Sequence, residues 1–81
     1  MNNGNEIPIE THDLYTAAFA DFKGIEIIYR KRPNGRVTFI LPAGQETANV
    51  LATYNSNPQI PALDFVQSLR KVRAKMIALR S

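Results

Sequence analysis

The chain of 81 residues contains no cysteine and one histidine, His12. Without cysteine there can be neither a disulfide framework nor a thiolate metal site, and His12 has no second histidine with which to hold a metal. The glycines are isolated, so no glycine-rich phosphate loop is present. The sequence therefore predicts that the protein is not an enzyme, has no metal site and no cofactor, and acts on no small-molecule substrate.

Long apolar runs are also missing. No stretch approaches the ~20 residues that a membrane-spanning helix requires, and the N-terminus lacks the basic and apolar regions of a signal peptide. The hydrophobic content of 44% is that of an ordinary folded protein. We expect a cytoplasmic protein without a membrane partner. The Asn-rich residues 1–10 should form a flexible tail, and residues 11–81 a single domain small enough for oligomerisation to help its stability.

The net charge of +3 conceals two basic blocks. Residues 1–29 carry a net charge of −4 and residues 37–69 a net charge of −2, whereas residues 30–36 carry +4 and residues 70–81 carry +5. Such an asymmetry can guide an anionic partner or arrange two subunits head to tail.

The first basic block coincides with a predicted β-hairpin. Pro33 presets φ for the first central position of a turn, Asn34 suits the second, and Gly35 tolerates the positive φ that follows a type I turn. These residues predict a three-residue loop with a bulge at the glycine, closed by Arg32 facing Arg36.

This register assigns the hairpin side chains to two faces, because side chains alternate along a strand. One face should pack on helices; it comprises Ile27, Tyr29, Val37, Phe39 and Leu41. The other face should carry Arg30, Arg32, Arg36 and Thr38 near the tip. An Ile28–Ile40 pair lies further down that second face, which indicates that another element or another subunit covers it.

Helical signals surround the hairpin. A first helix should begin after a cap at Thr11 or Asp13 and end at Gly24. A short helix is expected from about Gln45 to Tyr54, and a long one from near Pro61 to about residue 79. The predicted fold is α+β, in the order helix, β-hairpin, short helix and long C-terminal helix, with the helices on one face of the hairpin.

The long C-terminal helix carries the second basic block. A helical wheel places Arg70, Lys71 and Lys75 on the side opposite its apolar stripe. Arg73 falls inside the stripe. Either its stem lies on apolar surface while the guanidinium reaches water, or it pairs with an acid at an interface.

Several short segments occur in a recognisable order. They are Asp13-Leu14-Tyr15, Ala17-Ala18-Phe19, Arg36-Val37-Thr38-Phe39, Tyr54-Asn55, and Phe65 followed by Leu69-Arg70-Lys71. This pattern, over roughly residues 11–77, resembles a small bacterial and phage domain family known only as a domain of unknown function. The chain departs from the family at residues 41–44, where acidic residues are expected, and at Asn57, where glycine is expected. The resemblance implies that the protein functions in a bacterial, phage or mobile-element setting, but it implies no activity, ligand or catalytic residue.

Two functions from different classes fit these observations. The first is a non-enzymatic interaction or assembly module, with itself or another protein as partner, whose interface contains Ile28, Ile40 and Arg73. The alternative is a nucleic-acid-binding accessory protein with little sequence preference. Its phosphate contacts would come from Arg30, Lys31, Arg32, Arg36, Arg70, Lys71 and Lys75. One continuous basic face in the structure would favour nucleic acid; cations that meet acids across a two-fold axis would favour assembly.

Overall fold

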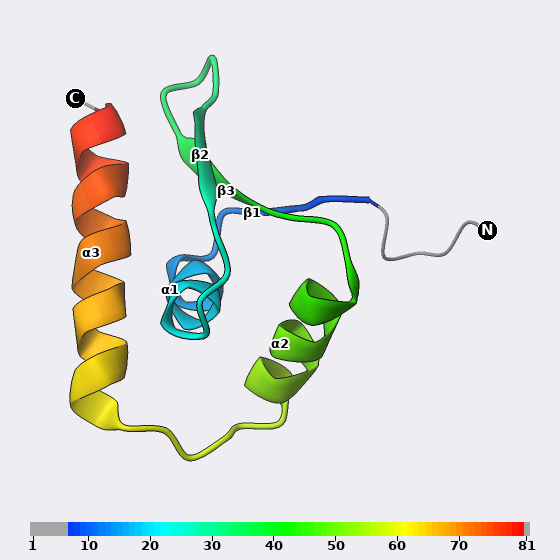
Figure 1. Ribbon diagram of the computed structural model, residues 1–81. Coiled ribbons are helices and arrows are strands. Elements are labelled where there is room, and N and C mark those ends of the chain that lie inside the picture. The colour runs from blue at the N-terminus through cyan, green and yellow to red at the C-terminus, as the bar shows by residue number, and fades with distance from the viewer. Residues whose placement is uncertain (1–6, 81) are drawn as a thin grey trace.

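The computed structural model describes residues 7–80, and these residues form an α+β fold as predicted (Figure 1). The elements in chain order are β1 (Ile9–Thr11), α1 (Leu14–Phe22), β2 (Ile28–Lys31), β3 (Val37–Leu41), α2 (Gln45–Asn55) and α3 (Ala62–Arg80). Within this part of the chain, no helix is both long and apolar enough to cross a lipid bilayer.

The sheet has three antiparallel strands in the order β1-β3-β2. The predicted hairpin register is confirmed, since Tyr29 faces Phe39 and Ile28 faces Ile40. Strand β1 was not expected: residues 9 and 10, assigned to the tail by sequence, pair with β3 instead, with Ile9 opposite Leu41. An open hairpin edge accepts a further strand, and three strands are more stable than two. The remainder of the predicted tail, residues 1–6, lies outside the described residues.

The hairpin turn also has the predicted form. The Arg32 N–H donates to the Arg36 carbonyl over 2.7 Å, and the Gly35 N–H donates to the Arg32 carbonyl over 2.9 Å. Gly35 has a φ of 86°, which a side chain would oppose. The result is a three-residue loop with a bulge, which fixes the register of every residue below it.

The three helices leave one face of the sheet bare, and the core lies on the other face (Figure 1). Val37, Phe39 and Val72 form one buried cluster together with Ala17 of α1. A second cluster contains Ala20, Ile25 and Leu41. Each large apolar side chain buried in this way contributes roughly 1.5–3 kcal/mol relative to exposure. The helix-covered face is therefore the source of most of the stability.

Local signals set the ends of the helices. The Asp13 carboxylate caps α1, because its Oδ1 accepts the Tyr15 N–H at 3.2 Å and its Oδ2 accepts the Thr16 hydroxyl at 2.6 Å. Gly24, with a φ of 85°, follows the end of α1. Asn57, where glycine was expected, has a φ of 57°. Asparagine is among the side chains that tolerate this left-handed conformation best, so the departure from glycine leaves the turn intact.

Candidate nucleic-acid interface

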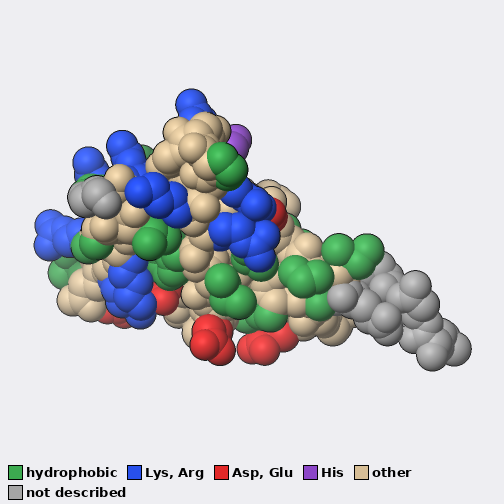
Figure 2. Space-filling model, turned by 90° about the horizontal axis from the view of Figure 1, so that it is seen from above, with side chains coloured by type: hydrophobic (Ala, Val, Ile, Leu, Met, Phe, Trp, Pro, Cys, Tyr) green, Lys and Arg blue, Asp and Glu red, His purple; other side chains and the backbone are tan. Residues whose placement is uncertain are grey.

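The hairpin tip and the C-terminal end of α3 lie at the same end of the molecule (Figure 1). The two basic blocks, which are far apart in the sequence, are thereby brought together. Figure 2 looks down on this end and shows many Lys and Arg side chains over it, whereas the Asp and Glu side chains lie mainly along one border of the view. The tertiary structure therefore provides a basic surface that neither block forms alone.

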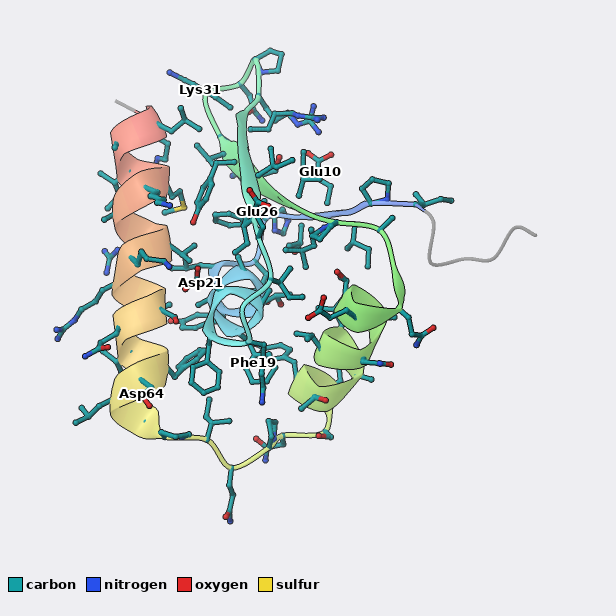
Figure 3. The ribbon with its side chains drawn as sticks, in the orientation of Figure 1. Glu10, Phe19, Asp21, Glu26, Lys31 and Asp64 are labelled. Carbon is teal, nitrogen blue, oxygen red and sulfur yellow. The ribbon has the colours of Figure 1, made fainter. Side chains whose placement is uncertain are left out.

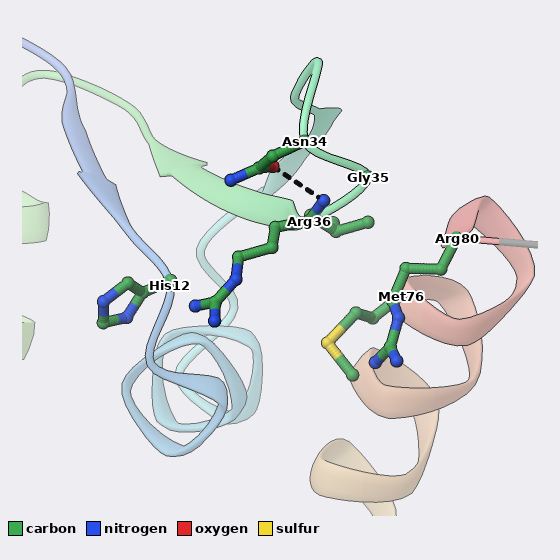
Figure 4. Close-up of a pocket in the computed structure, with 7 residues that line it drawn as sticks. His12, Asn34, Gly35, Arg36, Met76 and Arg80 are labelled. Atoms are coloured by element: carbon green, nitrogen blue, oxygen red, sulfur yellow. Dashed lines mark hydrogen bonds between the residues drawn. The ribbon is translucent and has the colours of Figure 1, made fainter.

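The centre of this surface is a groove between the hairpin tip and α3, with a volume of about 500 Å³. Its lining residues are His12, Asn34, Gly35, Arg36, Val37, Met76 and Arg80. Arg36 extends from the hairpin toward His12, and Arg80 reaches in from the last turn of α3 (Figure 4). The Asn34 Oδ1 accepts the backbone N–H of Arg36 at 2.9 Å and so orders the chain where Arg36 leaves the turn. The lining contains two guanidinium groups and no carboxylate, a composition suited to an anion.

Two further cations extend the groove. Lys31 faces Val37 in the sheet register and reaches out on the α3 side of the hairpin (Figure 3). Arg73 lies beside Arg80 in an adjoining hollow that also contains Met76. Arg73 is exposed, so its head reaches water from the edge of the apolar stripe, the first of the two arrangements considered for it. We call Lys31, Arg36, Arg73 and Arg80 the basic end; within residues 7–80 none of them forms an ion pair with a carboxylate.

Arg30 and Arg32 lie on the bare face of the sheet, as the register predicted, but Arg36, which was expected beside them, lines the groove. Arg32 forms an ion pair with Glu10 of β1, and the Thr38 hydroxyl donates to the same carboxylate at 2.5 Å. The hydrogen bond from Thr38 lowers the pKa of Glu10 most, followed by that from Arg32; the charge of Arg30 lowers this pKa further. Arg36 is not part of this group, because its side chain lines the groove that also contains Met76 and Arg80.

The cations predicted on α3 serve different roles. The Lys71 Nζ lies 2.9 Å from the Asp21 Oδ1 of α1, and the Lys75 Nζ lies 5.6 Å from the ring centroid of Tyr29 in β2. Both therefore face neighbouring elements, rather than the side opposite the apolar stripe as the wheel predicted. Arg70 is exposed, but it precedes Arg80 by roughly 15 Å along the helix at the usual rise per residue. The seven cations predicted as one site thus fall into separate groups.

Arg80 and His12 were missing from the predicted site. Arg80 belongs to the second basic block, so its charge was visible in the sequence, but its neighbours were not. Only the course of α3 alongside the hairpin, with its C-terminal end level with the hairpin tip, brings it to the turn (Figure 1). Within residues 7–80, no group of three or more side chains is arranged to hold a metal ion.

The two predicted interface isoleucines differ sharply in exposure. Ile28 is 60% exposed and Ile40 only 8%. The reason is strand β1: it places Ile40 in the middle strand, opposite Glu10 on one side and Ile28 on the other. Ile28 remains on the edge strand, beside a hollow of about 210 Å³ that it shares with Pro8, Glu26, Ile40 and Pro42. Within the described chain, no helix covers this bare face.

Comparison with family models, with curated proteins and with solved structures found no match to this chain.

Proposed function

We propose that the protein is a non-enzymatic cytoplasmic module that binds the phosphate backbone of nucleic acid with its basic end. The observation that carries this proposal is the groove in which Arg36 of the hairpin and Arg80 of α3 face a common space without a carboxylate (Figure 4). Guanidinium groups match phosphate oxygens with paired N–H donors, and they stay charged at every physiological pH.

An extended polyanion fits this surface better than a single small anion. The groove is open, and Lys31 and Arg73 continue the positive charge on either side of it. Four separated cations match a row of phosphates, whereas a small anion would use only the central pair. No residue of the basic end is placed to read base edges in a defined way, so we expect little dependence on sequence.

The test is fluorescence anisotropy with labelled duplex DNA, single-stranded DNA and RNA at several salt concentrations. If the four cations of the basic end contact phosphates, the logarithm of the association constant on duplex DNA should fall with the logarithm of salt with a slope of roughly −3 to −4. Replacing one contacting arginine should weaken binding to all sequences alike and reduce the slope by about 1.

A matched pair of variants on α3 makes the test specific. Arg80→Ala removes a cation from the groove, whereas Arg70→Ala removes an exposed arginine of the same helix outside it. We expect Arg80→Ala and Arg36→Ala to reduce the slope and Arg70→Ala to leave it unchanged. Equal losses from Arg70→Ala and Arg80→Ala, or no binding at the lowest salt, would refute the basic end as the binding surface.

A second candidate function is a protein-interaction or assembly module, and a different observation favours it. Ile28 is 60% exposed on a sheet face that no helix of the described chain covers. A large aliphatic side chain at the rim of an apolar hollow is a common feature of protein contact surfaces. The basic end and this face do not overlap, so the two functions can be tested separately.

A further inference from the structure

We propose that a second copy of this chain docks on the bare face of the sheet, with a two-fold axis passing close to Ile28. The proposal deepens the assembly function by naming the partner, and it is independent of nucleic-acid binding. It rests on the arrangement of one acidic, one apolar and one basic residue along a single line of this face.

The apolar centre of the contact is the row formed by Ile28 and Ile40. Ile28 stands 60% exposed next to the hollow of about 210 Å³ that has Pro42 at its edge. In a face-to-face pair of sheets, side chains of the two inner faces interdigitate. With the axis close to Ile28, the projecting Ile28 side chains of the two copies would lie against each other, and the apolar hollows beside them would also meet. The apolar centre is thus built from the same residues of both copies. This is the requirement of an isologous contact.

The charges on either side of Ile28 have the same self-complementary order. Glu26 lines the hollow on one side of Ile28. Arg30 follows Ile28 by two residues in β2 and faces Thr38 across the sheet, so it shares the bare face on the other side. A two-fold axis in the plane of the contact, perpendicular to β2, reverses the strand direction. It therefore sets Glu26 of each copy against Arg30 of the other, which gives two opposite-charge pairs around the apolar centre.

The remaining carboxylate on this face does not oppose the arrangement. Glu10 lies in the same row as Ile40, and the two-fold operation brings it near its own counterpart. Its carboxylate, however, accepts from the Thr38 hydroxyl and pairs with Arg32, both toward the hairpin tip. Glu10 is thus neutralised within its own chain. Because the face comprises only three short strands, we expect a weak dimer in exchange with monomer.

Charge reversal gives a sharp test by sedimentation equilibrium over a wide range of protein concentration. Glu26→Arg and Arg30→Glu each convert both cross-pairs into like charges, and we expect each variant alone to dimerise at least ~10-fold more weakly than the original chain. In an equimolar mixture the two variants restore opposite charges at both positions, so a heterodimer should form with about the original affinity. Ile28→Thr should also weaken the dimer, whereas Leu63→Thr, which alters a 78% exposed leucine on α3, should not.

A photo-crosslinking benzophenone amino acid at position 28, introduced in cells, separates this proposal from the broader assembly function. A product of twice the chain mass supports the second copy as partner. An adduct with a different protein keeps the assembly function and overturns the homodimer, and the absence of any adduct contradicts both. A chain that stays monomeric at every concentration, or charge variants that dimerise as the original chain does, would also overturn the proposal. Circular dichroism confirms that each variant is folded.

Discussion

The two faces of the three-stranded sheet consist of neighbouring residues of the same strands, yet one face packs into the core and the other is turned toward solvent. On the helix-covered face, Phe39 and Leu41 have no exposed surface. On the bare face, Ile28 is 60% exposed and the Arg32–Glu10 ion pair lies open to solvent. A shift of one residue along β3 therefore moves a side chain from the core to a surface available for binding. Alternate residues of one hairpin thus lie either in the core or on the bare face, which is where we propose that a second copy docks.

The bare face itself is divided between its centre and its edge. Ile40 in the middle strand is 8% exposed because residues of β1 and β2 flank it, whereas Ile28 on the edge strand has such a neighbour on one side only. An apolar residue on this face can thus be structural or available for contact, depending on its strand. Substitutions at these positions measure how much each side chain contributes to the free energy of unfolding. They compare the helix-covered face with the bare face, and the centre of the bare face with its edge.

The largest effect should come from the helix-covered face. Phe39→Ala leaves a cavity, because it removes a buried ring that packs edge-on against Tyr29 with 5.6 Å between the two ring centroids. We expect the free energy of unfolding to fall by about 3–5 kcal/mol, a large part of what a domain of this size possesses. Urea denaturation followed by circular dichroism measures it. A loss no greater than that at Ile28 would break the comparison between the faces.

Ile40→Ala tests the centre of the bare face. Ile40 lies between Glu10 and Ile28 in the sheet and lines the hollow beside Ile28, so truncation would enlarge a depression open to solvent and would not create an enclosed cavity. We expect the free energy of unfolding to fall by about 2 kcal/mol, the lower end of the range for truncating a buried aliphatic side chain. The same urea experiment applies, and a loss equal to that of Phe39→Ala would show that something covers this face in solution.

Glu10→Gln examines the polar part of the bare face through its pH dependence. The folded-state pKa of Glu10 is lowered, chiefly by the hydrogen bond from Thr38, so the ionised carboxylate stabilises the fold. This contribution is present above the usual titration range of glutamate, and it disappears as the pH falls through the lowered folded-state pKa. We expect the original chain to be slightly more stable than the Gln variant at neutral pH and the difference to vanish in acid. Thermal melts across pH would show a constant difference if the contact with Thr38 and Arg32 contributed nothing.

Ile28→Thr should have the smallest effect on stability. Threonine keeps the β-branched shape that suits a strand, and the side chain it replaces is mostly in water. At concentrations where the chain is monomeric, we expect a change within about 0.5 kcal/mol. Urea denaturation at low protein concentration checks this, and a loss near that of Ile40→Ala would mean that the edge residue is part of the monomer core.

Much of this fold was readable from local sequence. Pro33, Asn34 and Gly35 determine a turn of known length, and the turn length fixes which hairpin residues face each other. The cap at Asp13 and the positive φ of Gly24 are equally local, because they depend on side-chain hydrogen bonds and glycine sterics over a few residues. The α+β order of elements followed from these signals together with the helical apolar stripes.

The candidate site depended on contacts that no local pattern encodes. Strand β1 is three residues long and pairs with β3, which is distant in the sequence, so its own sequence carries little signal. By adding to the sheet it buried Ile40 and left Ile28 at an edge. The packing of α3 beside the hairpin tip placed Arg36 in a groove with Arg80, whereas Arg32 pairs with Glu10.

By itself, the sequence determined the three helices, the hairpin with its register, and the presence of two basic blocks, because turn chemistry, capping and charge act over a few neighbouring residues. The tertiary structure alone decided which cations meet. It joined Arg36 to Arg80 in one groove and engaged Lys71 with Asp21 elsewhere. These pairings depend on how α3 packs against α1 and along the sheet, a property of the assembled core that no single segment contains.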